Sequence, residues 1–157
     1  MLLEKMLLST PLGQLLITSS ERGITTIVFT EETTSDTSSE LESLAASQLQ
    51  EYFEGNRKTF DFPLDPHGTD FQKRVWHELL NVSFGTTSSY LALSRILGDE
   101  KAIRAVAAAN GKNPIAVVIP CHRIIGSDGS LTGYAGGLWR KEWLLRHESK
   151  TEGMLLL

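Results

Sequence analysis

Residues 89–111 read SYLALSRILGDEKAIRAVAAANG, a pattern that limits the possible folds more than any other part of the chain. It predicts a helix from about 89 to the glycine at 98, and a second helix from about 99 to 110. Two short helices around a tight glycine-containing turn are typical of a helix-turn-helix, although such helix pairs are also common packing units without DNA contact. The second helix is rich in alanine, so its backbone could lie close to another surface.

The residues before this pair predict a small α+β domain. Two β runs, 13–18 and 24–29, flank a turn-prone segment. Apolar residues at helical spacing predict a helix over 41–53, and polar alternation over 60–62 predicts a further strand. Residues 63–68 are typical of a linker, so we place the end of the first domain at residue 68.

A second domain is expected to begin at Thr69. Thr69 and Gln72 have the spacing of a capping box, which predicts a helix start. The apolar run 117–119 predicts a buried strand, and a glycine-rich loop over 133–137 precedes a helix over 138–148. The fold class is therefore α+β: domain 1–68 with a small sheet and helix, then a mainly helical, winged-helix-like domain 69–157.

Composition limits the cellular context. A chain of 157 residues can bury a substantial core, and its one cysteine cannot form an internal disulfide. A free thiol favours a reducing compartment, so we expect a cytoplasmic protein. Glu4 and Lys5 interrupt the apolar N-terminal stretch, which excludes a secretory h-region there and favours a protein without a membrane partner.

Charge is distributed unevenly, although the chain as a whole carries −4. Residues 1–69 hold four Lys and Arg against eleven Asp and Glu, a net −7. Residues 70–157 hold eleven basic and eight acidic residues, a net +3. Contact with a polyanion is therefore expected from the second half, although an acidic solvated face explains the first half equally well.

The single cysteine has unusual neighbours, in the run Pro120-Cys121-His122-Arg123. A lone cysteine is ordinarily a small buried hydrophobe. Here a histidine and an arginine are adjacent, and either could favour the thiolate that a nucleophile requires. Consecutive side chains point apart in a strand, so His122 needs a turn or a bridging water to act on the sulfur.

This run, followed by Gly133-Tyr134-Ala135-Gly136-Gly137 and then Lys141, Leu144-Leu145 and Glu148, resembles the O6-alkylguanine-DNA alkyltransferases of the constitutive bacterial type. The resemblance extends from Thr10 to Glu148. It implies a ribonuclease-H-like first domain and a monomer that acts on double-stranded DNA from the minor groove. It also implies repair of O6-alkylguanine, and of O4-alkylthymine, by irreversible alkyl transfer to Cys121 after base flipping.

The resemblance also implies roles for individual residues. Cys121 would be the nucleophile, His122 its base through water, and Glu148 the group that orients the imidazole. Asn113 would help to position these hydrogen bonds, although a plain turn explains it as well. Tyr90 would rotate the nucleotide and donate a hydrogen bond to the leaving guanine, although a half-buried core tyrosine is the simpler interpretation.

DNA contact is implied for the alanine-rich helix, where Arg104 would fill the gap left by the flipped base. The alternative for Arg104 is a surface arginine paired with Glu100. Further contacts with DNA are expected from Ala105, Ala108 and Arg123. The pocket for the base would be formed by Tyr134, Ala135, Gly136 and Gly137. Many relatives have serine where this chain has Ala135, so only a backbone donor is available at that position.

We expect no metal and no cofactor, because the N-terminal half lacks the cysteines that hold zinc in some relatives. Three other functions remain open. A noncatalytic alkyltransferase-like damage-binding protein would share the fold but replace the nucleophile, which is present here. A helix-turn-helix regulator leaves the Pro-Cys-His-Arg run unexplained, and a cysteine hydrolase would show multiple turnovers.

Overall fold

The computed structural model describes residues 5–34 and 39–153. The sequence predicts a loop in the Ser/Thr-rich stretch 33–39 and assigns no role to the apolar tail 154–157; residues 35–38 and this tail lie outside the described residues. Contacts divide the chain into two compact units, Met1–His67 with Pro114–Val118, and Gly68–Asn113 with Ile119–Leu157. Residues 114–118, which the sequence places in the second domain, thus belong to the first unit.

The first unit contains a three-stranded antiparallel sheet in the order β1-β2-β3. Its strands are β1 (Lys5–Thr10), β2 (Gly13–Ser19) and β3 (Ile24–Thr30). The sequence predicts β2 and β3, whose inward residues such as Leu15 and Ile27 are fully buried. It misses β1, because this edge strand buries none of its residues fully and so lacks the alternation that marks a half-buried strand.

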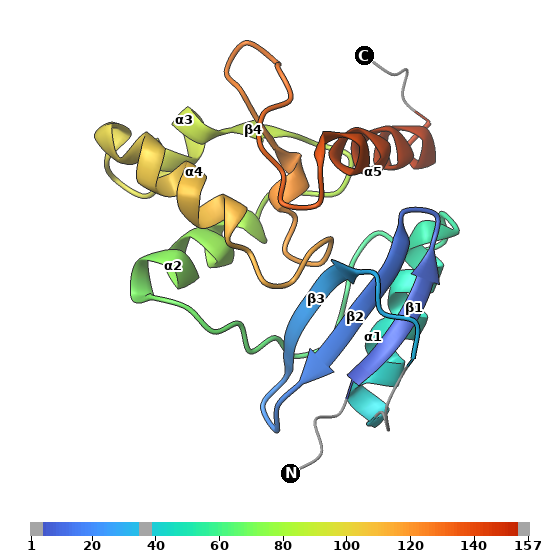
Figure 1. Ribbon diagram of the computed structural model, residues 1–157. Helices are drawn as coiled ribbons and strands as arrows, with labels where there is room; N and C mark the ends of the chain where they lie inside the picture. Colours follow the sequence, from blue (N-terminus) through green and yellow to red (C-terminus); the bar gives the residue numbers. More distant parts are fainter. Residues whose placement is uncertain (1–4, 35–38, 154–157) are drawn as a thin grey trace. The chain divides into compact units, whose positions relative to one another are not determined.

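Helix α1 (Glu40–Phe53) lies along one face of this sheet (Figure 1). A capping box begins it, in which the Ser39 side chain accepts from the backbone of Glu42 and the Glu42 side chain accepts from that of Ser39. Leu49 and Tyr52 on its inner face are fully buried. The predicted helix over 41–53 is therefore confirmed.

The strand predicted over 60–62 is wrong. Gln48 of α1 accepts a hydrogen bond from the Asp61 backbone N–H at 3.0 Å, so a side chain satisfies the group that a sheet ladder would use. The Phe60 and Phe62 rings pack edge to face with centroids 6.0 Å apart. Residues 63–68 are no free linker either, because Ile24 donates to the Pro63 carbonyl at 2.9 Å.

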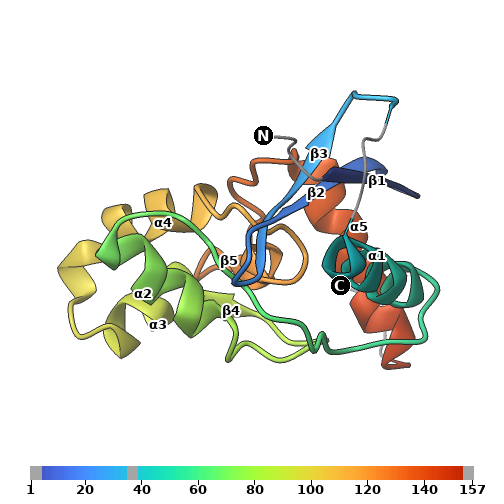
Figure 2. The same cartoon turned by 90° about the horizontal axis from the view of Figure 1, so that it is seen from below.

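The second unit is mainly helical. Its helices are α2 (Asp70–Leu79), α3 (Tyr90–Ile96), α4 (Ile103–Gly111) and α5 (Leu138–Thr151). Helices α2 and α3 both pack on α4 (Figure 2), and the Trp76 indole of α2 donates to the Ala109 carbonyl of α4 at 2.8 Å. Within residues 5–34 and 39–153, none of the helices has the length and hydrophobicity of a membrane span.

The helix starts of this unit follow the sequence closely. The capping box of Thr69 and Gln72 begins α2, and the Ser89 side chain caps α3. A short 3-10 helix, η1 (Glu100–Ala102), precedes α4, so the second helix of the pair is α-helical over a shorter range than predicted. The α+β fold with a helical C-terminal part is confirmed.

The strand predicted over 117–119 is wrong, although all three residues are buried. Val117 has a positive φ of 71°. The Val118 N–H donates across it to the Ala116 carbonyl at 2.8 Å, which closes a γ-turn, a rare conformation for a branched residue. A run of buried apolar residues can thus form a turn that burial alone does not reveal.

Candidate active site

A second γ-turn positions Cys121 within the second unit. The Cys121 N–H donates to the Ile119 carbonyl at 2.8 Å, across Pro120 with φ −83° and ψ 62°. The chain then forms the 3-10 helix η2 (Cys121–Arg123) and β5 (Ile124–Ile125), which pairs in parallel with β4 (Ser88–Ser89). This turn removes the strand geometry that would separate Cys121 and His122.

Two asparagines fix the backbone around the cysteine. Asn113 Nδ2 donates to the Ile119 carbonyl at 2.7 Å, and the Asn113 side chain also hydrogen-bonds the Cys121 thiol. Asn110 Nδ2 lies 3.4 Å from the Cys121 carbonyl oxygen. Asn113 therefore lies beside Cys121, whose hydrogen bonds the resemblance expects it to position. The sequence predicts no role for Asn110.

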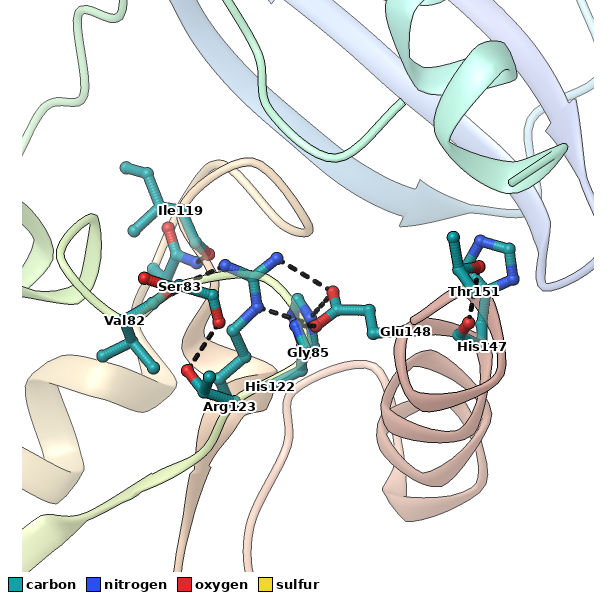
Figure 3. A network of polar contacts seen from close by, with 11 residues as sticks. Val82, Ser83, Gly85, Ile119, His122, Arg123, His147, Glu148 and Thr151 are labelled. Atoms are coloured by element: carbon teal, nitrogen blue, oxygen red, sulfur yellow. Dashed lines mark hydrogen bonds and ion pairs between the residues drawn. The ribbon is translucent and has the colours of Figure 1, made fainter. Parts of the chain in front are cut away.

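His122 is held by Glu148 of α5. His122 Nε2 lies 2.7 Å from Glu148 Oε2, and both side chains are buried (Figure 3). An ionised carboxylate can only accept, so Nε2 carries the proton. The other ring nitrogen, Nδ1, has no hydrogen-bond partner among the described residues. In the neutral imidazole this nitrogen is the unprotonated one, able to accept a proton.

Arg123 faces the same carboxylate. Its Nε and Nη2 donate to Glu148 at 2.8 and 3.0 Å, and its Nη1 donates to the Val82 carbonyl at 2.7 Å (Figure 3). Arg123 is only 6% exposed. The DNA contact expected from Arg123 is therefore replaced by an internal role, because all three of its nitrogens are already committed to partners inside the second unit.

Charge in this cluster favours a neutral histidine. Burial alone would raise the pKa of Glu148, but His122 and Arg123 together hold it well below its ordinary value. Burial lowers the pKa of His122, and this effect outweighs the opposing attraction of Glu148. The carboxylate is thus ionised at neutral pH, and the imidazole is neutral with its one proton on Nε2, which is the state that a general base requires.

The thiol itself is not activated in advance. Burial raises the pKa of Cys121 above its ordinary value, and Asn113 and Lys141 offset only part of this rise. Neither His122 nor Arg123 contributes, contrary to the possibility raised by their adjacency. The thiolate must therefore form by proton transfer when the reaction occurs.

Lys141 of α5 is a buried cation beside this cluster. Its Nζ donates to the backbone carbonyls of Ile124, at 2.5 Å, and Thr132, at 2.9 Å. Burial lowers its pKa to about 8, and the charge of Cys121 acts in the opposite direction. Tyr90 OH donates to the same Thr132 carbonyl at 3.1 Å. Through these hydrogen bonds Lys141 links β5 to Thr132, the residue before the glycine-rich loop.

A cavity of about 570 Å³ opens in the second unit. Its lining residues are Tyr90, Ile103, Arg104, Ala107, Asn110, Gly111, Thr132, Gly133, Tyr134 and Ala135. Two of the four predicted pocket residues, Tyr134 and Ala135, are among them. Gly136 and Gly137 are not, and Gly137, with φ 93°, is instead the N-cap residue before α5. Tyr134 OH is buried without a partner among the described residues.

The residues of α4 from which DNA contact is expected lie on its exposed face. Arg104, Ala105 and Ala108 are all exposed. Glu100 pairs with Arg95 at 2.8 Å and not with Arg104, so the alternative interpretation of Arg104 as its partner fails. Within the described part of the chain, Arg104 has no ion-pair or hydrogen-bond partner.

Family models match both parts of the chain. Residues 3–66 match the ribonuclease-like domain of 6-O-methylguanine DNA methyltransferase, and residues 70–150 match its DNA-binding domain. The chain belongs to this family. Among the described residues of this family member, no group of three or more His, Cys, Asp or Glu could hold a metal ion.

Individual relatives agree with the family match. The chain is 43% identical over 149 residues to a methylated-DNA–protein-cysteine methyltransferase of Methanosarcina barkeri, covering 90% of this chain and 94% of that protein. Its fold is similar to that of Mycobacterium tuberculosis O6-methylguanine methyltransferase, with a TM-score of 0.86, 40% identity and coverage of 96% and 94%. The same relative in complex with DNA also gives a TM-score of 0.86, with 40% identity and 94% of each chain covered.

The sequence left two residues of this site without a role, Asn110 and Lys141. Lys141 lies on the face of α5 that also buries Leu144 and Glu148. The sequence signal for Lys141 was its helical spacing from Leu144, because a charged residue on the apolar face of a helix is expected to be buried. Asn110 likewise follows Val106 by one turn on the buried face of α4.

Proposed function

We propose that this protein repairs DNA by transferring the alkyl group of O6-alkylguanine, and of O4-alkylthymine, irreversibly to Sγ of Cys121. One observation carries the proposal. The only cysteine of the chain is followed by a buried histidine whose Nε2 is fixed by a carboxylate and whose Nδ1 is unpaired among the described residues. The relatives at 40–43% identity are methyltransferases by name, which supports the same assignment.

The reaction is a displacement at the alkyl carbon. His122 Nδ1 takes the thiol proton through a water molecule, and Glu148 stabilises the imidazolium that forms. The Sγ–C bond then forms while the C–O6 bond breaks, and guanine leaves with the electron pair. The proton that His122 took from the thiol passes through solvent to the guanine, which restores the neutral imidazole. Tyr134, whose buried hydroxyl has no partner among the described residues, supplies a donor near the developing charge. Tyr90 also lines the cavity and donates to the base by exchanging its hydrogen bond to the Thr132 carbonyl. The thioether product ends the activity, so each molecule acts once.

The substrate reaches the cavity as a flipped base. Arg104, on the exposed face of α4, occupies the gap in the duplex while Ala105 and Ala108 let the helix approach the minor groove. In this assignment residues 69–157 form the DNA-binding and alkyltransferase domain, and residues 1–68 the ribonuclease-H-like domain. We place the protein in the cytoplasm on the basis of its single cysteine, and we take it to be a monomer from the family resemblance.

Isotope transfer tests the proposal. The protein is incubated with duplex DNA containing O6-(trideuteriomethyl)guanine, digested, and its peptides are weighed. The label is expected on the peptide that contains Cys121 and on no other. Label on a different residue, or label that leaves with repeated addition of DNA, would contradict transfer to Cys121.

A further inference from the structure

The loop between α2 and β4 contacts both members of the buried ion pair in the candidate active site. The Val82 carbonyl accepts from Arg123 Nη1 at 2.7 Å, and the Gly85 N–H donates to Glu148 Oε1 at 3.3 Å (Figure 3). Phe84 lies between these two contacts along the chain, and Arg123 Cζ is 5.7 Å from the centroid of its ring. Backbone and side chain of one short loop thus hold the cluster from the same side.

We call residues 82–86 the covering loop, because polar side chains on it face water while its aromatic ring faces the cluster. Ser83 and Thr86 are exposed, whereas Phe84 is half-buried. The loop closes on itself, since the Thr86 N–H and hydroxyl both donate to the Ser83 carbonyl, at 3.0 and 2.6 Å. A guanidinium within about 6 Å of an aromatic face makes a favourable contact, which holds the Phe84 ring over Arg123.

The atoms behind this loop are those on which the proposed base depends. His122 is fully buried, and its Nε2 is bonded to a Glu148 carboxylate that is itself only 1% exposed. We propose that Phe84 is a positioning residue of the reaction, whose ring closes the covering loop over Arg123 and keeps water from the His122–Glu148 hydrogen bond. This inference rests on the proposed function and adds to it a residue that acts through the ion pair.

Exclusion of water matters because burial keeps the imidazole neutral. Three charged groups act on His122: Glu148 and Lys141 of α5, and Arg123 of its own 3-10 helix η2. Burial has the largest effect and lowers the pKa of His122, Glu148 raises it, and the two cations lower it further. Water admitted through the covering loop would weaken the effect of burial. The pKa of His122 would then rise, and the base would become protonated at a higher pH.

The pH profile of methyl transfer tests this role, because a loss of packing alone would slow the reaction to the same extent at every pH. Single-turnover rates with a duplex containing O6-methylguanine are measured from pH 8 to pH 5.5. In Phe84→Ala the ratio of the rate at pH 6 to the rate at pH 8 is expected to be roughly three- to tenfold lower than in wild type. Phe84→Leu keeps an apolar cover, so its profile should stay close to that of wild type.

Proton exchange provides a second measurement, which needs no loop variant for its first result. The His122 Nε2–H should exchange slowly with water and give a visible NMR resonance in the wild-type protein, assigned by its absence in His122→Asn. The resonance should be lost in Phe84→Ala and kept in Leu80→Ala. Leu80 is the matched control, because it is an exposed apolar residue at the end of α2, shortly before the covering loop. Circular dichroism at pH 6 and pH 8 checks that each variant is folded.

Failure of this inference differs from failure of the proposed function. Profiles of Phe84→Ala and wild type that are parallel at every pH, whatever the rates, would show that Phe84 only packs and would overturn the inference. A His122 Nε2–H that exchanges freely in the wild-type protein would overturn it as well. A wild-type protein that takes no methyl group from the duplex would instead overturn the proposed function, and with it the reaction that Phe84 serves.

Discussion

His122 Nε2 lies 2.7 Å from Glu148 Oε2, and neither side chain has significant contact with solvent. The same carboxylate accepts two hydrogen bonds from Arg123. One buried anion is therefore shared between a fixed cation and a neutral imidazole. This arrangement sets the histidine tautomer and leaves Nδ1 as the basic atom, which is the feature that the proposed chemistry depends on.

Replacing the shared anion should impair both chemistry and stability. In Glu148→Gln the imidazolium loses its stabilising charge, so single-turnover methyl transfer is expected to slow by on the order of 100-fold. Arg123 is left as a buried charge without its ion partner, which should lower the free energy of unfolding by about 3–5 kcal/mol. Urea denaturation and rapid-quench kinetics measure the two effects. Glu142→Gln, on the exposed face of the same helix, is the matched control and should change neither.

Stability should fall in mild acid because of His122. Its pKa in the folded protein is below the ordinary 6.5, so below that pH the unfolded chain binds a proton that the folded chain does not. The contribution is therefore complete above pH 6.5 and is lost as the pH falls toward the lower folded value. Glu148, whose folded pKa is also lowered, adds a loss of the same sign below pH 4.5.

Urea midpoints between pH 8 and pH 5 measure this effect. The wild-type midpoint should decrease below pH 6.5, and His122→Asn should show a shallower decrease over the same range. Parallel curves for the two proteins would mean that His122 is not the group responsible.

The buried ammonium of Lys141 should assist thiolate formation. Its charge lowers the pKa of Cys121, although burial keeps that pKa above its ordinary value. Lys141→Met should therefore slow iodoacetamide modification at pH 7, where Lys141 is still charged because its pKa is about 8, and the signal is specific because the chain has one cysteine. Lys150→Met removes an exposed charge from the same helix and serves as the control. An unchanged rate of modification in Lys141→Met would mean that Lys141 acts only through its hydrogen bonds to the backbone.

Arg104 should matter only when the base is in a duplex. Arg104→Ala is expected to slow methyl transfer from duplex DNA by roughly tenfold or more, because the arginine no longer fills the gap left by the flipped base. Reaction with the free base O6-benzylguanine, which requires no flipping, should be unchanged. Arg146→Ala removes an exposed arginine from α5 and is the control. Equal slowing on both substrates would place Arg104 in the chemistry of the cavity instead.

Local signals in the sequence predicted the fold well where local contacts determine it. The capping residues Ser89 and Thr69 hydrogen-bond within their own first turns, so three or four residues suffice to reveal them. The prediction of a strand over 117–119 was wrong because two γ-turns, closed by the Val118 and Cys121 N–H groups, bend the chain there. Apolar character indicates that these residues are buried but does not determine their backbone conformation. The edge strand β1 was missed because only its pairing with β2 defines it.

The site divides in the same way. The Pro-Cys-His-Arg run identified Cys121 and His122 through the family resemblance, and that resemblance also indicated Glu148. The internal role of Arg123 could not be predicted, because its partners Val82 and Glu148 are 41 and 25 residues away in the chain. The unpaired Oδ1 of Asn110 likewise becomes visible only when the cavity is assembled.

The most direct test of the account is the intact mass of the protein after incubation with excess duplex containing one O6-methylguanine. We predict a gain of one methyl group per molecule that saturates at one and does not occur in Cys121→Ser. Tight binding to the damaged duplex with no change in mass would contradict the account, and would indicate recognition of the lesion without repair.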